Sequence, residues 1–150
     1  MIKSRAQAGI TLMELMIAVA IVGILGAVAL PSYRDYVRRG QLPEAVGALS
    51  DYRIKMEQYY QDRRNFGAAG CADGAGAPAW SDFKPKEAKY FGYSCELLEN
   101  GQGYRVTATG GEAAAKGHVY SIDHDNNRRT TSFKGTAVNK ACWLIQGSEC

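Results

Sequence analysis

One carboxylate stands out as a side chain that could do chemistry. Glu14 is the one charged residue between Ile10 and Leu30, a stretch that is otherwise almost entirely apolar. An ionised carboxylate in hydrocarbon costs on the order of 3 kcal/mol unless it is paired. Glu14 could also avoid this cost by staying protonated or by reaching the nearby interface. A carboxylate in such a place indicates a functional role with a specific partner.

The stretch around Glu14 has the length and composition of a membrane-spanning helix. A helix rises about 1.5 Å per residue and needs roughly 20 apolar residues to cross the hydrocarbon core. Lys3 and Arg5 precede the stretch, and no acidic residue accompanies them. Because positive flanks stay in the cytoplasm, we expect the N-terminus to lie inside and the rest of the chain outside.

The same residues carry a family resemblance. The run from Gly9 to Glu14, Gly-Ile-Thr-Leu-Met-Glu, and the apolar stretch after it resemble the class III signal of type IV prepilins. Residues 31–39 are typical of the juncture that follows in pilins. The likeness is looser at Tyr120–Asp123, at Thr130-Thr131 and at Cys142-Trp143. Ile10 departs from the pattern, since the family most often has Phe as its first mature residue.

The resemblance implies a processing and assembly pathway. A prepilin peptidase would cleave after Gly9, and the new amino terminus at Ile10 would be N-methylated. Glu14 would then pair with the α-amino group of a neighbouring subunit and set the register. Other pilin subunits and the inner-membrane assembly machinery would be the partners. The chain would first be a single-pass inner-membrane protein and later part of an extracellular pilus.

This pathway divides the chain into three parts. Residues 1–9 would be the leader, and 10–30 would span the membrane and later form the filament core. Residues 31–150 would form an extracytoplasmic globular domain that includes the amphipathic half of the helix.

The helix is predicted to continue past the membrane and to become amphipathic. Pro31 removes a backbone donor and predicts a kink rather than a stop. Gly40 and Pro43 predict a second bend or a short break, and the helix should end near Asp62. Apolar residues then recur at three- and four-residue spacing, which predicts one face packed on a sheet: Leu42, Ala45, Val46, Leu49, Tyr52, Met56, Tyr59 and Tyr60.

The C-terminal part reads as a sheet. Gly67 to Ala79 is rich in small residues and predicts a loop. Four short strands with turn signals between them follow, at Tyr90–Leu98, Tyr104–Thr109, His118–Asp123 and Arg128–Phe133. A helix followed by strands joined through short turns predicts an α+β fold. We therefore expect the type IV pilin fold, a long helix packed on a four-stranded antiparallel sheet.

The chain has four cysteines, and its globular part should lie outside the cytoplasm. Two disulfides are therefore expected, and three pairings are possible. We favour Cys71 with Cys95, which would anchor the small-residue loop to the first strand. The other pair would be Cys142 with Cys150, closing the C-terminal loop. Their spacings are not those of a zinc site.

Other candidate sites are weaker. Asp123, Asp125 and Asn127 imitate the start of a calcium loop, but Arg128 stands where that loop needs Gly. His118 and His124 lack a nucleophile motif or a phosphate loop beside them. We predict no enzymatic activity, no metal and no cofactor.

Charge bears on whether nucleic acid is a partner. Loss of Lys3 and Arg5 with the leader would lower the formal charge from +3 to +1. So small an overall charge gives no default reason to invoke DNA. A local basic set near the C-terminus, Arg128, Arg129, Lys134 and Lys140, could still contact phosphates.

The main functional hypothesis is a structural pilus subunit, of the minor or pilin-like kind, that serves adhesion, twitching motility or DNA uptake. Two related hypotheses remain open: a pseudopilin of type II secretion and a DNA-binding minor pilin that acts as an uptake receptor. An unrelated single-pass membrane protein is a third.

Overall fold

The structure is a computed structural model that describes residues 10–150. The predicted leader, residues 1–9 with Gly9, lies outside the described residues. Within these described residues the fold consists of one α-helix and five β-strands, with two short 3-10 helices in the loops. The chain divides into two compact units, one ending at Tyr36 and the other comprising Val37–Cys150.

Helix α1 runs from Leu12 to Arg63. Thr11 caps its first turn, because the Thr11 hydroxyl accepts a hydrogen bond from the Glu14 amide at 3.2 Å. The helix continues through Pro31, Gly40 and Pro43 without interruption. Of the bend or short break predicted near Gly40, the break is therefore wrong, because packing of the following turns overrides the weak helix propensity of Gly. The bend stays a prediction. The kink at Pro31 stays a prediction.

The first part of α1, residues 12–30, is exposed within the chain except at Gly26, which is half-buried. An 18-residue window there has a mean hydropathy of 2.5 and no buried residue. By length and composition this part could cross a membrane. Isolated in water, such a surface would be a strong signal for association.

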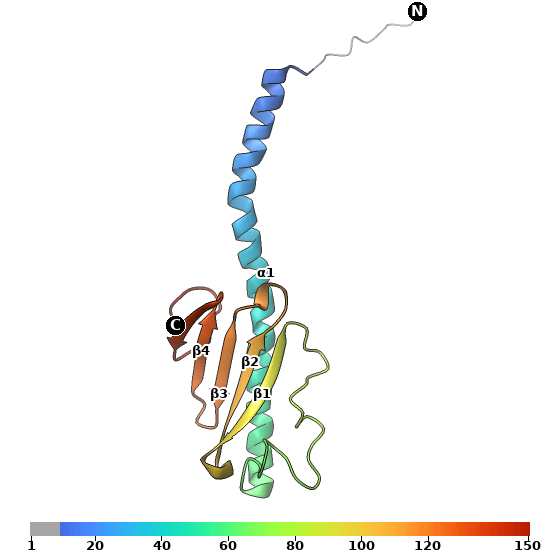
Figure 1. Cartoon of the computed structure of the whole chain (residues 1–150), viewed down its shortest axis with the longest axis vertical. Coiled ribbons are helices and arrows are strands. Elements are labelled where there is room, and N and C mark those ends of the chain that lie inside the picture. The colour runs from blue at the N-terminus through green and yellow to red at the C-terminus, as the bar shows by residue number, and fades with distance from the viewer. Residues whose placement is uncertain (1–9) are drawn as a thin grey trace, which may run out of the picture. The chain divides into compact units, whose positions relative to one another are not determined.

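The second half of α1 packs on a sheet (Figure 1). The sheet is an antiparallel meander in the order β1-β2-β3-β4-β5. Its strands are β1 (Phe91–Leu98), β2 (Gly103–Gly110), β3 (Val119–Asp123), β4 (Arg128–Phe133) and β5 (Thr136–Lys140). The prediction of a helix on an antiparallel sheet is confirmed, but the strand number is five, not four.

Strand β5 was missed because its signals are weak. Its one apolar residue larger than Ala is Val138, which is half-buried. The turn before it is a two-residue hairpin loop in which Lys134 and Gly135 both have positive φ, 55° and 79°. Such a loop matches the twist of the strands. Lys is not typical of this type of turn, so Gly135 was the one residue in the sequence that indicated it.

The core lies between α1 and one face of the sheet. Six residues of the predicted stripe are buried there: Leu42, Ala45, Leu49, Tyr52, Met56 and Tyr59. They form one cluster with the inward side chains of β2 and β3, which include Tyr104, Val106, Tyr120 and Ile122. Val46 and Tyr60 are only half-buried.

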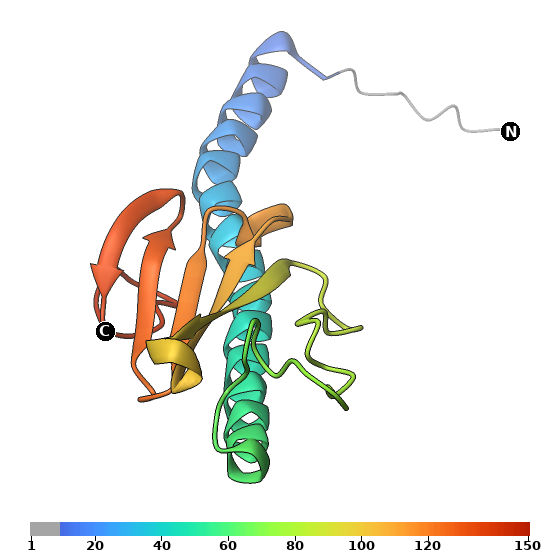
Figure 2. The same cartoon turned by 60° about the horizontal axis from the view of Figure 1, so that its bottom comes forward.

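The loop between α1 and β1 is held at several points. Glu44 of α1 accepts hydrogen bonds from the amides of Lys89, Tyr90 and Phe91 at 3.0 to 3.2 Å. This carboxylate therefore fixes the start of β1 against the helix. Figure 2 shows the loop beside β1 and the C-terminal segment at the other edge of the sheet.

Two disulfides close the loops on either side of the sheet. Cys71 is bonded to Cys95 of β1, and Cys142 is bonded to Cys150. These are the two pairings that the sequence analysis favoured.

Candidate functional site

The first candidate site is the exposed apolar part of α1 with its single charge. Ile10, Leu12 and Met13 are more than 70% exposed, and Leu25 is 63% exposed. Glu14 lies in the first turn of the helix. There it is near the positive end of the helix dipole, which favours a carboxylate. Its amide is taken by the Thr11 hydroxyl, and no side-chain hydrogen bond of the carboxylate occurs within residues 10–150. The carboxylate is therefore available to a group outside the chain.

The second candidate site is the basic set at the C-terminal strands. Arg128 and Arg129 begin β4 and are exposed. The guanidinium of Arg128 lies over the Trp143 ring, 4.9 Å from its centre, which is a cation–π contact. The indole N–H of Trp143 in turn donates to the Ser121 carbonyl at 2.9 Å. Arg128 is therefore positioned by a side chain that is fixed to β3.

The four predicted basic residues do not form one patch. Lys140 pairs in register with Thr130, close to the arginines, but its ammonium group forms an ion pair with Glu149 at 2.8 Å. Lys134 lies in the turn at the other end of β4. Five residue steps of a strand span about 17 Å. Arg128 and Arg129 are thus the exposed, adjacent pair of this set, and Lys134 lies far from them.

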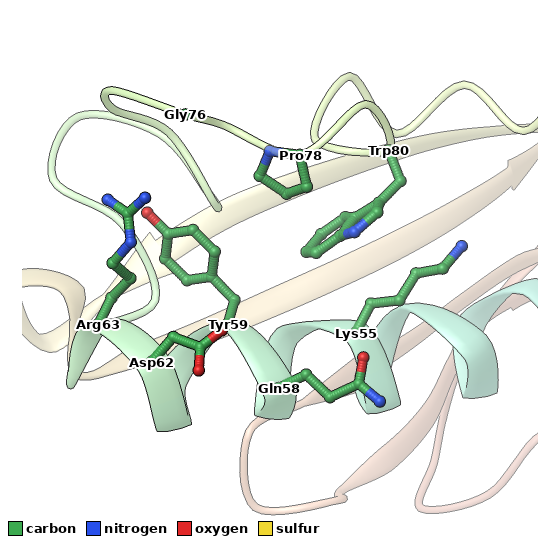
Figure 3. A pocket seen from close by; sticks show the side chains of 8 residues that line it. All are labelled: Lys55, Gln58, Tyr59, Asp62, Arg63, Gly76, Pro78 and Trp80. Atoms are coloured by element: carbon green, nitrogen blue, oxygen red, sulfur yellow. The ribbon is translucent and has the colours of Figure 1, made fainter.

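A third site, which the sequence analysis missed, is a pocket between α1 and the loop that follows it (Figure 3). It has a volume of about 210 Å³. Lys55, Tyr59, Asp62 and Arg63 line it from the helix, and Pro78 and Trp80 line it from the loop. The helical residues recur at three- and four-residue spacing, and this was the one sequence signal. Nothing in the sequence indicated that Trp80 would return to that face.

The remaining sequence candidates have structural roles. The Asp123 carboxylate closes the β3–β4 turn by accepting from the amides of Asp125 and Asn127 at 3.1 and 2.9 Å. His118 is 1% exposed. Burial lowers the pKa of His118, and the nearby Arg38 and Lys134 lower it further. His118 therefore belongs to the core as a neutral ring.

Comparison with known proteins gives two family matches. Residues 31–118 match the family described as "Type IV minor pilin ComP, DNA uptake sequence receptor". Residues 4–30 match the prokaryotic N-terminal methylation motif. Together the two models cover residues 4–118.

The chain belongs to the type IV pilin family.

Individual relatives agree with this assignment. The pilin is 34% identical over 126 residues to the type IV major fimbrial protein FimA of Dichelobacter nodosus, covering 77% of this chain and 74% of that protein. It is 42% identical over 103 residues to the type IV major pilin protein PilE1 of Neisseria gonorrhoeae, covering 69% of this chain and 52% of that protein. The chain spans about half the length of several other curated pilins that it matches.

A solved structure supports the fold. The minor pilin PilV of Neisseria meningitidis matches with a TM-score of 0.50 at 17% identity, covering 74% of this chain and 98% of that one. At this identity the likeness concerns the fold alone. The predicted type IV pilin fold is confirmed.

Proposed function

We propose that this pilin is a subunit of a type IV pilus and that the first part of α1 builds it into the filament. The observation that carries the proposal is the contrast within one helix. Residues 10–30 are apolar and uncovered, with Glu14 as their one charge, whereas the second half of α1 is covered by its own sheet. The exposed apolar part therefore needs a cover from outside the chain.

Lipid and sister helices can each supply that cover in turn. Before assembly, the helix would span the inner membrane once, and a peptidase would cut after Gly9 and leave an N-methylated Ile10. After extraction, the helices of neighbouring subunits would replace lipid. Both surroundings are apolar, so the exchange changes hydrophobic energy little. Packing and the Glu14 charge must then set the register, with the assembly machinery supplying the work.

Glu14→Gln tests this role, because it removes the charge and keeps the volume. We expect a cleaved protein that stays in membranes and is depleted about tenfold in sheared filaments. Val28→Leu, a conservative change in the same apolar stretch, is the matched control and should enter filaments normally. Equal incorporation of Glu14→Gln and the wild type would remove the role of the carboxylate. Failure of cleavage in the wild type would remove the pilus proposal itself.

The matched family favours a pilus over a type II secretion pseudopilin, and it also favours a second function. The model that matches residues 31–118 is named for a DNA uptake receptor, and Arg128 and Arg129 are exposed on this chain. We infer that this pilin binds duplex DNA through the phosphate backbone. Arg is suited to phosphate because its planar guanidinium donates two parallel hydrogen bonds.

The salt dependence of binding tests the DNA proposal. Each phosphate contact contributes a slope of about −0.9 in a plot of log affinity against log salt. In the full chain, held in neutral detergent, Arg128→Gln should reduce this slope by about one. Lys116→Gln removes an exposed charge from the loop at the other end of β3 and should leave the slope unchanged. No affinity of the wild type for duplex DNA would overturn this second function.

A further inference from the structure

We propose that the pocket between α1 and its following loop seats one unpaired nucleobase, so that this pilin prefers DNA with a single-stranded tail. This inference rests on the proposed DNA-binding function and deepens it. It concerns a site apart from Arg128 and Arg129, which lie on β4. All the residues that line the pocket fall inside the segment matched by the DNA-receptor family, residues 31–118.

The walls of the pocket are fixed before any ligand arrives. Arg63 donates from Nη2 to the carbonyl of Ala75 at 2.9 Å, and the Tyr59 hydroxyl donates to the carbonyl of Asp73. The Asp73 carboxylate accepts from the amides of Ala68, Ala69 and Gly70 at 2.7 to 2.8 Å. The small-residue loop is thus tied to the helix and to itself. A preorganised site loses little affinity to ordering.

The chemistry of the walls suits a flat aromatic ring that carries a phosphate. Trp80 is half-buried and rests edge-on against Phe83, with ring centres 6.0 Å apart, and Figure 3 shows its indole directed toward the helix beside Pro78. The Tyr59 ring lies on the other side of the hollow. Aromatic side chains bind bases of any sequence by stacking. Asp62 supplies an acceptor for the polar edge of a base.

Two cations lie at the rim where phosphates would pass. The Arg63 guanidinium sits 5.6 Å from the centre of the Tyr59 ring, and it keeps further donors beyond the bond to Ala75. Lys55 forms an ion pair with Asp51 at 2.6 Å, but both partners are exposed enough to exchange it for a phosphate. With Asp62 included, the lining carries one net positive charge. These cations would add no charge attraction to the binding of a neutral sugar.

The volume of the pocket and the energy of base stacking both favour a base that is already unpaired. The pocket volume of about 210 Å³ is below the roughly 300–1,000 Å³ of sites for drug-sized ligands, so it has room for one ring system and not for a base pair. Stacking on an aromatic side chain is of the same order as the cost of unpairing and unstacking a base inside a duplex. Extrusion of a paired base would therefore give no net gain in binding free energy. The bases of a single-stranded tail are already unpaired and do not carry this cost.

The test compares a blunt duplex with the same duplex carrying an oligothymidylate tail, both bound to the full chain in neutral detergent. We expect the wild type to bind the tailed duplex about tenfold more tightly. Trp80→Ala should reduce this ratio to about one, and Trp80→Phe, which keeps a ring, should retain most of it. Melting curves of the variants check that the domain remains folded. A ratio near one in the wild type, or an undiminished ratio in folded Trp80→Ala, would overturn the proposal.

A second arm separates this inference from the DNA-receptor proposal. The chain has two tryptophans, so Trp143→Phe leaves Trp80 as the single reporter. Oligothymidylate alone should quench Trp80 fluorescence. Because Trp143 supports Arg128, the affinity for blunt duplex is measured on the wild type. Quenching in Trp143→Phe without any such affinity in the wild type would support the pocket while the receptor function fails. Duplex binding without quenching would leave the receptor function and overturn the pocket, and so would quenching by a neutral sugar but not by oligothymidylate.

Discussion

The two halves of α1 both carry leucines, but these leucines have different surroundings. Leu25 is 63% exposed, whereas Leu42 and Leu49 have no exposed surface. The second half finds its cover within the chain, on the sheet that follows it in sequence. The first half finds none among residues 10–150. The comparison teaches that one continuous helix can serve folding at one end and association at the other.

The largest expected effect is a loss of stability confined to the second half. Leu49→Ala leaves a cavity in the core and should lower the free energy of unfolding by about 2–5 kcal/mol. Leu25→Ala is the matched control and should change the stability of the domain by less than about 0.5 kcal/mol. Urea denaturation of the full chain in neutral detergent, followed by tryptophan fluorescence, measures both. Similar losses of unfolding free energy in the two variants would contradict the different roles assigned to the two halves of α1.

Periodicity revealed this division without a structure. The spacing of Leu42, Ala45, Leu49 and Tyr52 predicted the buried face because a helix repeats every 3.6 residues. The three- and four-residue rule overestimated burial at Val46 and Tyr60, which lie at the margins of the stripe. The break near Gly40 was wrong because a local propensity of about 1 kcal/mol is outweighed by packing.

The candidate sites were less predictable than the fold. Glu14 was visible because its charge contrasts with every neighbour. The pocket was not, because Trp80 reaches it through a loop without periodicity. Arg128 was recognised as basic, but its support by Trp143 depends on a contact across 15 residues of sequence. Such contacts follow from tertiary structure, which sequence spacing does not encode.

The two disulfides of the domain should differ in how much they stabilise it. Replacing both Cys71 and Cys95 by Ser should lower the free energy of unfolding by about 3 kcal/mol, since the bond closes a loop with a sequence separation of 24. It also anchors the loop that carries the pocket. Thermal melting under oxidising conditions measures the change. An unaltered melting temperature would show that the hydrogen bonds of Asp73 hold this loop alone.

The corresponding change at Cys142 and Cys150 should cost less. This bond spans a separation of 8, and the segment has other anchors. Thr130 donates from its hydroxyl to the carbonyl of Cys142 at 2.6 Å, and the Tyr120 hydroxyl donates to the carbonyl of Leu144 at 2.7 Å. The melting temperature should therefore fall by less when Cys142 and Cys150 are replaced by Ser than when Cys71 and Cys95 are. A larger fall would mean that these hydrogen bonds depend on the disulfide.

The smallest expected effect is a pH dependence that belongs to the domain alone. The neutral ring of His118 donates from Nδ1 to the Ala115 carbonyl at 2.9 Å and accepts at Nε2 from the Lys134 amide at 3.4 Å. Protonation would place a second donor against Lys134, with the Arg38 cation nearby. Burial keeps the pKa of His118 below its ordinary value of 6.5.

The sign of this effect follows from linkage. Below pH 6.5, His118 binds a proton in the unfolded chain but stays neutral in the folded chain until the pH reaches its lowered pKa. The stability of the fold therefore decreases as the pH drops from 6.5 toward the pKa of His118 in the folded chain. His118→Gln should remove this decline, because the amide does not titrate. Melting temperatures between pH 7.5 and about pH 5 measure it. A decline that persists in His118→Gln would assign it to another group.

We propose that the uncovered half of α1 becomes the core of a filament after the leader is removed. Intact mass spectrometry without reduction, applied to sheared surface filaments and separately to membranes, tests it most directly. We predict a filament-derived chain that begins at methylated Ile10 and is lighter by the four hydrogens lost in two disulfides. An uncut chain found only in membranes would contradict the account.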